Sequence, residues 1–235
     1  MLDSYRFLCE VSLKIPGAQR ITGKPAHMRI FWYYLGLGVF LLAIYACARR
    51  NEKHKDGREK ADLCVSRRKK RLQGIVFSCF IAFLLLFLLF PQKKSFEIDF
   101  LDVGQGDGIY LCTGGGTSMF IDGGSTDVKQ VGKYRILPFL KAKGVSEISY
   151  WFVSHTDTDH VSGLKEVLVS GYRVEYLVFA KAVEKEAKTK ELAELARSHG
   201  TKVLYMQAGD TVRSKRAAMR CLYPKASDKA EDVND

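Results

Sequence analysis

Two long uncharged segments constrain the fold of this chain more than any other feature. The first, Ile30–Ala48, has 19 residues, and the second, Leu72–Gln92, has 21. A bilayer core about 30 Å thick needs roughly 20 apolar residues in a helix. A signal peptide would lie at the extreme N-terminus and have a shorter apolar region. A buried helix pair would need more surrounding protein than 235 residues provide. We therefore predict transmembrane helices at 30–48 and 72–92.

Basic residues gather beside these two segments. The chain has 37 Lys and Arg against 26 Asp and Glu, a net charge of +11. Residues 49–71 alone carry +7, whereas 91–235 carry +1, so the excess charge does not by itself indicate nucleic-acid binding. Short loops rich in Lys and Arg stay in the cytoplasm. The loop 49–71 is therefore predicted to be cytoplasmic, with 1–29 and 95–235 outside, and its run 67–71 (RRKKR) is expected to touch anionic lipid headgroups.

The segment 95–235 is long enough for one folded domain with a sizeable core. It opens with three short strand patterns separated by glycine turns, and then alternates between helix and strand patterns. The expected strands are 96–104, 109–113, 117–122, 147–154, 174–180, 201–206 and 218–224, and the expected helices are 136–144, 162–170 and 181–200. The strongly apolar strand 147–154 is expected to be buried on both faces. This order predicts a layered α/β domain.

Four side chains that can bind metals follow strand 147–154. They are His155, Asp157, Asp159 and His160, in HTDTDH, at the strand end where ligands collect in α/β proteins. Imidazole suits zinc, iron and manganese, and carboxylates favour harder cations. A polar loop with Asp159 as a helix cap would explain one aspartate and not the whole set. We predict a site for one or two divalent ions made by these four residues.

The motifs also carry a family resemblance. HTDTDH after an apolar strand resembles the metallo-β-lactamase signature His-x-His-x-Asp-His, with Asp157 in place of the second His. Together with DVGQGDG (102–108), IDGG (121–124) and ITGKPAHMRIFWYYLGLG (21–38), it is similar to the C-terminal part of ComEC-type competence proteins, which move transforming DNA across the bacterial inner membrane. The resemblance implies two transmembrane helices followed by an αββα metallo-β-lactamase-like domain. It makes 1–29 a remnant of the channel domain.

The resemblance also implies roles for particular residues. His155 and Asp157 would bind one metal, and Asp159 and His160 would complete that site or bind a second ion. Asp159 would also orient or deprotonate the attacking water. The extra carboxylate favours manganese over zinc. The implied reaction is phosphodiester hydrolysis in one strand of incoming DNA, with single-stranded DNA, membrane lipids and other competence proteins or channel segments as partners.

Two aspartates upstream are expected to support the metal-binding loop from behind. Asp102 and Asp122 both lie at strand ends beside glycine turns. The alternative is ordinary turn chemistry, since Asp before Gly is common in turns. Both interpretations remain open from the sequence.

The chain also departs from the family pattern. The metallo-β-lactamase fold draws further ligands from a second half, but no histidine follows His199, and the chain stops at 231–235 (EDVND). The domain is therefore expected to be incomplete and the chain truncated at both ends. Two alternative functions follow: a non-catalytic part of a DNA channel, or a metallo-hydrolase for another substrate, since 91–235 is nearly neutral and the DNA assignment rests on resemblance.

Overall fold

The computed structural model describes residues 2–15, 20–53, 63–90, 94–214, 217–225 and 228. The chain divides into two compact units, Lys24–Gln92 and the combination of Met1–Gly23 with Lys93–Asp235. Residues 54–62, in the middle of the predicted cytoplasmic loop, and the C-terminal 231–235 lie outside the described residues.

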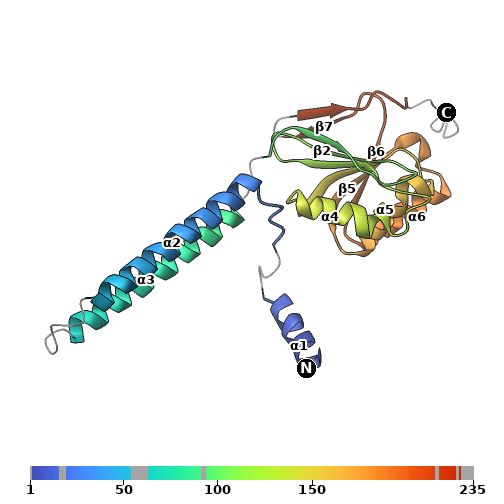
Figure 1. Cartoon of the computed structure of the whole chain (residues 1–235). Helices are drawn as coiled ribbons and strands as arrows, with labels where there is room; N and C mark the ends of the chain where they lie inside the picture. The colour runs from blue at the N-terminus through green and yellow to red at the C-terminus, as the bar shows by residue number, and fades with distance from the viewer. Residues whose placement is uncertain are drawn as a thin grey trace. The chain divides into compact units, whose positions relative to one another are not determined.

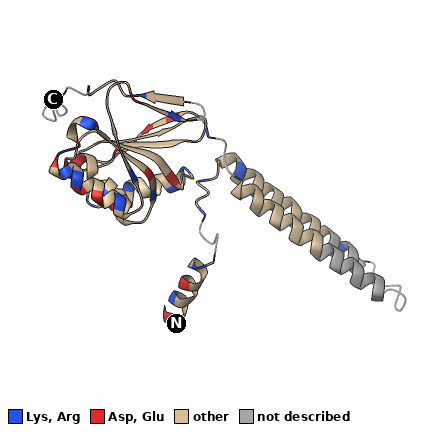
Figure 2. Cartoon of the chain, turned by 180° about the vertical axis from the view of Figure 1, so that it is seen from behind, with Lys and Arg blue, Asp and Glu red and all other residues tan. Residues whose placement is uncertain are grey.

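The smaller unit contains two long helices, α2 (His27–Lys53) and α3 (Leu63–Leu89) (Figure 1). They pack through aromatic side chains, with the ring of Phe40 stacked on Phe77 and Phe80 at centroid distances of 5.2 and 4.2 Å. The parts of both helices that Figure 2 draws in colour are almost entirely uncharged, whereas the sequence of α3 carries five basic residues at 67–71. The helix α1 (Leu2–Leu13) precedes this unit in the chain.

One membrane-span candidate is present in the described part of the chain. It is His27–Ala46 of α2, which includes most of the predicted span 30–48 and has no buried residues, whereas Gly74–Leu89 of α3 is a shorter apolar helix. The second span, 72–92, therefore stays a prediction. The side chains of 67–71, which were expected to touch lipid headgroups, lie outside the described part.

The larger unit is built on a six-stranded mixed sheet in the order β1-β2-β3-β4-β5-β6. Strands β1 to β3 pair antiparallel, and β3 to β6 pair parallel. The strands are β1 (Glu97–Phe100), β2 (Gly108–Cys112), β3 (Ser118–Asp122), β4 (Glu147–Val153), β5 (Arg173–Ala180) and β6 (Lys202–Met206). A separate antiparallel hairpin is formed by β7 (Thr211–Ser214) and β8 (Ala217–Arg220).

Helices cover one face of this sheet, and the hairpin lies on the other side (Figure 1). The helices are the π-helical turn Gly132–Ile136, α4 (Leu137–Ala142), α5 (Thr158–Val169), the 3-10 turn Lys181–Val183 and α6 (Ala187–Ser198). The main core lies between the sheet and these helices, where Trp151, Leu164 and Leu177 are fully buried. The predicted layered α/β arrangement is confirmed, and the complete αββα fold stays a prediction.

The prediction that strand 147–154 is buried on both faces is wrong for one face. Ile148, Trp151 and Val153 are buried, but Tyr150 and Phe152 are only half-buried. Phe152 borders an apolar cavity of about 370 Å³ whose opposite wall comes from β8 and the residues after it. The hairpin therefore covers this face less completely than the helices cover the other.

Two helices begin at residues that differ from the prediction. The helix predicted at 162–170 begins at Thr158, and the helix predicted at 181–200 starts as a 3-10 turn and becomes α-helical at Ala187. The positive end of the helix dipole stabilises an acidic residue in the first turn, and Asp159 is such a residue in α5. Asp159 and His160 are thus helical residues and not loop residues.

Candidate metal-binding site

The candidate site lies where β3 and β4 end and α5 begins. β3 ends at Asp122, β4 ends at Val153, and the chain enters α5 at Thr158. Since β3 and β4 are parallel neighbours, their carboxyl ends meet at one edge of the sheet, where ligands bind in α/β folds. The short connection 154–157 therefore carries the HTDTDH motif across this edge.

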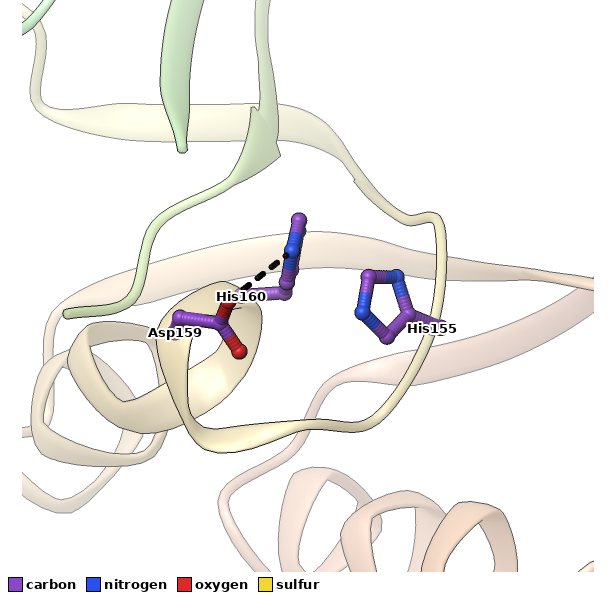
Figure 3. Close-up of side chains that lie close together, drawn as sticks. All are labelled: His155, Asp159 and His160. Atoms are coloured by element: carbon purple, nitrogen blue, oxygen red, sulfur yellow. Dashed lines mark ion pairs between the residues drawn. The ribbon is translucent and has the colours of Figure 1, made fainter. Parts of the chain in front are cut away.

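Three of the four predicted ligands come together there. His155, Asp159 and His160 each offer a ligand atom, and these atoms lie within 4.8 Å of one another (Figure 3). The Nε2 atom of His160 is 3.5 Å from Oδ2 of Asp159, and the two imidazole ring centroids are 3.7 Å apart. All three residues are half-buried, so they are held in place and remain reachable from solvent.

The fourth predicted ligand, Asp157, takes a different partner. Lys188, in the first turn of α6, donates a hydrogen bond to Oδ1 of Asp157 at 3.0 Å, and Oδ2 lies 3.9 Å from Nε2 of His155. The hydrogen bond from the Lys188 ammonium holds the pKa of Asp157 below its usual range. Asp157 is the residue before α5, but its side chain makes no capping hydrogen bond. One oxygen of the Asp157 carboxylate thus contacts Lys188, and the other lies near His155 at the edge of the site.

Asp122 holds His160 from behind. Its side chain is 7% exposed, and its two oxygens accept the backbone N–H and the hydroxyl of Ser154, each at 2.8 Å. Its Oδ2 atom is also 3.1 Å from Nδ1 of His160. A proton on Nδ1 satisfies this contact and leaves the lone pair of Nε2 facing Asp159. This carboxylate–imidazole pairing is the usual way in which a metal-binding histidine is oriented.

Asp102 lies apart from the predicted metal ligands and contacts other residues. Its Oδ2 atom pairs with Arg135 at 3.1 Å, and its Oδ1 atom accepts the backbone N–H of Gly104 at 3.4 Å. The side chain is largely exposed. Of the two aspartates that the sequence suggested as supporting residues, Asp122 contacts a predicted ligand, His160. Asp102 instead accepts a hydrogen bond within its own turn and pairs with Arg135.

A further aspartate, Asp107, was missed as a site residue. Its Oδ2 atom lies 3.8 Å from Nδ1 of His160, and Asp107, Asp122 and His160 form a second group with ligand atoms within 4.8 Å of one another. Asp107 belongs to the DVGQGDG motif, whose glycines indicated only a turn. The available signal was an acidic residue beside that turn, at the amino end of strand β2.

Close backbone packing brings these segments together. The N–H of Asp107 donates to the carbonyl of Asp159 at 3.3 Å, and its own carbonyl accepts the N–H of Gly124 at 3.2 Å. A Cβ atom on Gly106 would lie 2.5 Å from the Asp159 carbonyl oxygen, and one on Gly124 would lie 2.4 Å from the Asp159 carbonyl carbon. Only glycine permits this approach. Glycines in both upstream motifs, Gly106 and Gly124, therefore allow those segments to pack directly against the backbone of the first turn of α5.

Comparisons with known proteins give two relatives and no matching family model. The chain is 28% identical to ComE operon protein 3 of Bacillus subtilis (strain 168) over 182 residues, which cover 71% of this chain and 23% of that protein. It is 31% identical to Recombination protein 2 of Haemophilus influenzae over 106 residues, which cover 44% of this chain and 13% of that protein. Both matches point to a competence or DNA-uptake family. The chain spans less than a quarter of the length of either relative.

The donor chemistry of the site fits a divalent cation. Two imidazoles and a carboxylate are a common set of three protein ligands for zinc and for other divalent transition metals. Four carboxylates meet at this edge of the domain, from Asp107, Asp122, Asp157 and Asp159, and the ammonium of Lys188 pairs with one of them. A bound divalent cation would offset the remaining negative charge. His155, Asp159 and His160 are the residues that can hold it.

Proposed function

We propose that this chain is a membrane-anchored part of a DNA-uptake machinery, and that its α/β domain is a metal-dependent hydrolase of phosphodiester bonds. The observation that carries the catalytic part is the convergence of His155, Asp159 and His160 at one edge of the sheet, with Asp122 behind His160. The two relatives support the DNA-uptake part. Neither a soluble binding domain nor a purely structural domain requires such a donor set.

Each residue of the site has a distinct role in the proposed reaction. His155, Asp159 and His160 hold a divalent cation, manganese or zinc, which supplies Lewis-acid activation of the phosphodiester and of water. Asp122 fixes the tautomer and the orientation of His160. Asp159 is also the proposed general base. One of its oxygens lies beside Nε2 of His160, and its side chain is partly exposed, so water can reach the carboxylate. Lys188 pairs with Asp157 at the rim of the site and offsets its negative charge.

The proposed substrate is single-stranded DNA, and the proposed location is the bacterial inner membrane. The helices α2 and α3 would both cross the bilayer, with the basic loop between them in the cytoplasm and the α/β domain outside. The candidate span in α2, the shorter apolar helix in α3 and the two relatives support this arrangement. Other competence proteins or channel segments would complete the machinery.

A nuclease assay on the full chain in detergent tests the proposal. Labelled single-stranded DNA is incubated with manganese and, separately, with zinc, and the Asp159→Asn variant is run beside the parent and beside Glu194→Gln, an exposed charge change on α6. We expect degradation by the parent and by Glu194→Gln and none by Asp159→Asn. Equal degradation by all three would trace the activity to a contaminant. Tight zinc binding without manganese binding would remove the preference for manganese.

A non-catalytic role in DNA transport is the second candidate. In the described residues, each group of ligand-type side chains has three members, which is fewer than a two-metal hydrolase uses. This role predicts DNA binding that weakens steeply with added salt, and no strand cleavage with any divalent metal. Cleavage of simple phosphate esters without DNA binding would instead indicate a hydrolase for another substrate.

A further inference from the structure

The hydroxyl of Ser154 lies within hydrogen-bond distance of both histidines of the candidate metal site. Its Oγ atom is 3.1 Å from Nδ1 of His155 and 3.4 Å from Nδ1 of His160. It is also 2.8 Å from Oδ2 of Asp122. Ser154 directly precedes the HTDTDH motif and follows the last residue of β4, Val153. One hydroxyl thus contacts the buried aspartate and both imidazoles.

The bonding capacity of this hydroxyl sets the direction of its contacts. A serine hydroxyl has one donor and two acceptor lone pairs, whereas a carboxylate can only accept. The single O–H of Ser154 is donated to Oδ2 of Asp122, so its oxygen can only accept from an imidazole. Ser154 is exposed, yet its donor and both lone pairs have protein partners. The contact with His155 therefore requires a proton on Nδ1 of that ring.

This proton decides which nitrogen of His155 can bind a metal. A neutral imidazole has one N–H and one nitrogen with a free lone pair. With the proton on Nδ1, the lone pair lies on Nε2, the atom that is 3.9 Å from Oδ2 of Asp157 at the edge of the site. Figure 3 shows one ring nitrogen of His155 directed toward His160 and the other directed away. The hydroxyl of Ser154 thus occupies the nitrogen that is not needed for a metal.

His160 obtains the same tautomer from Asp122 without an intermediary. Its Nδ1 atom is 3.1 Å from Oδ2 of Asp122, whose side chain is 7% exposed. One buried carboxylate accordingly orients both imidazoles, His160 by a direct hydrogen bond and His155 through the hydroxyl of Ser154. Hydrogen bonds arranged in a chain polarise and strengthen one another.

The backbone of Ser154 is anchored independently of its hydroxyl. The N–H of Ser154 donates to Oδ1 of Asp122 at 2.8 Å, and the indole N–H of Trp151 donates to the carbonyl of Asp122. A Ser154→Ala substitution keeps both of these hydrogen bonds and removes the hydroxyl. The effect of the hydroxyl on His155 can therefore be separated from the folding of this loop.

We propose that Ser154 is a positioning residue for His155, whose hydroxyl holds the proton of that imidazole on Nδ1 and leaves the lone pair of Nε2 for the cation. The inference rests on the proposed metal site, but the tautomer of His155 can be measured without metal. The second nitrogen of a metal-binding histidine usually donates to a carboxylate, a backbone carbonyl or water. In His155 a serine hydroxyl takes that place and connects the ring to Asp122.

Nitrogen-15 NMR of the full chain in detergent, labelled at histidine and freed of metal, tests this role. Two-bond proton–nitrogen correlations show which ring nitrogen carries the proton, and they are recorded above the ordinary histidine pKa of about 6.5, where imidazole is neutral. The signals of His155 are assigned by their loss in His155→Gln. We expect the Nδ1–H tautomer in the parent and in Ser154→Thr, which keeps the hydroxyl, and a larger share of the Nε2–H tautomer in Ser154→Ala.

Ser198→Ala is the matched control, because Ser198 and His199 form an equivalent pair outside the site. The Oγ atom of Ser198 is 3.1 Å from Nδ1 of His199. This variant should keep the parent tautomer of His155 and the parent affinity for zinc. Zinc calorimetry should show a loss of about tenfold or more in Ser154→Ala and parent-like affinity in Ser154→Thr, with thermal unfolding confirming that the variants are folded.

Three results would overturn the inference and leave the proposed function intact. The first is a parent-like tautomer of His155 in Ser154→Ala, with or without a loss of zinc affinity. The second is a changed tautomer with unchanged zinc affinity, and the third is the Nε2–H tautomer in the parent itself. A parent that binds no divalent metal would instead overturn the proposed function, and a tautomer change in Ser154→Ala would still support the hold of the hydroxyl on His155.

Discussion

The ammonium of Lys188 lies 3.0 Å from the carboxylate of Asp157, so a residue of the ligand motif is paired with the first turn of a helix that follows about 30 residues later. The pair joins the connection between β4 and α5 to α6. It also explains why Asp157 stands apart from His155, Asp159 and His160, although it lies between them in sequence. Four predictions follow from this and the neighbouring contacts, each with its own measurement.

Lys188→Met should raise the pKa of Asp157 toward its ordinary value, because the hydrogen bond and charge of Lys188 are what lower it. A carboxyl whose pKa is depressed in the folded state adds stability above its unfolded pKa, about 3.9. That stability is lost as the pH falls through the folded pKa. The variant should therefore melt below the parent at pH 7, and the difference should shrink as the pH falls below about 4.

Carboxyl-detected NMR with labelled aspartate measures the pKa of Asp157 directly. Lys190→Met, an exposed charge change two residues along α6, is the control and should leave it unchanged. An Asp157 pKa that is the same in the parent and in Lys188→Met would show that the ion pair does not form in solution.

Asp122→Asn should weaken metal binding by about 10- to 100-fold, the usual cost of losing a carboxylate that orients a metal-binding histidine. The asparagine can still accept the N–H of Ser154 through its single oxygen, but its amide group cannot accept the proton on Nδ1 of His160. Calorimetric titration with zinc measures the change. Asp102→Asn is the comparison, because its carboxylate pairs with Arg135, and its metal affinity should match the parent. Equal losses in the two variants would contradict the assigned role of Asp122.

Gly124→Ala should destabilise the α/β domain and remove metal binding. The new Cβ atom would lie 2.4 Å from backbone atoms of Thr158 and Asp159, which cannot move without unwinding the first turn of α5. Overpacking of this kind typically costs about 1–3 kcal/mol.

Gly114→Ala is the matched control for that substitution, since the nearest atom to its Cβ is 3.9 Å away. Thermal unfolding followed by circular dichroism, with zinc titration on the folded fraction, compares the two. Parent-like stability and binding in Gly124→Ala would mean that the turn of α5 adjusts more freely than the packing indicates.

Trp151→Phe should lower stability while leaving the fold intact. The buried indole N–H of Trp151 donates to the carbonyl of Asp122 at 2.6 Å, and its ring packs on Phe120. Loss of this donor leaves a buried carbonyl without that partner, which costs about 1–3 kcal/mol. Denaturant unfolding measures the change, and an unchanged midpoint would show that water or another donor replaces the indole.

The strands of the sheet were largely predictable, because buried parallel strands such as 147–153 and 173–180 are short apolar runs bounded by glycines or charges. The beginning of α5 was not, since Thr158 and Asp159 are polar and resemble a loop until the backbone contacts with Asp107 and Gly124 are known. The strand β7 was missed because Thr211–Ser214 has a single apolar residue, Val212, that packs inward.

The site was predictable to the extent that its residues are close in sequence. The proximity of His155, Asp159 and His160 was predictable because imidazoles and carboxylates rarely gather in six residues, and their role as metal ligands stays a prediction. Asp107 and Lys188 reach the same edge from distant positions, and nothing in their own neighbourhoods indicates a metal or a salt bridge. The meeting of the turn before β2 with α5 depends on sheet order, which no local pattern specifies.

The positions of the site residues along the chain also set an order of events during synthesis. Every ligand-type side chain of the site comes from residues 107–160, between β1 and the first turn of α5, so the donor set is complete when α5 leaves the ribosome. Lys188 follows about 28 residues later, which takes a few seconds at typical translation rates. During that interval the nascent chain would present Asp157 without its counter-charge, and the candidate metal site would carry its largest negative charge before α6 is synthesised.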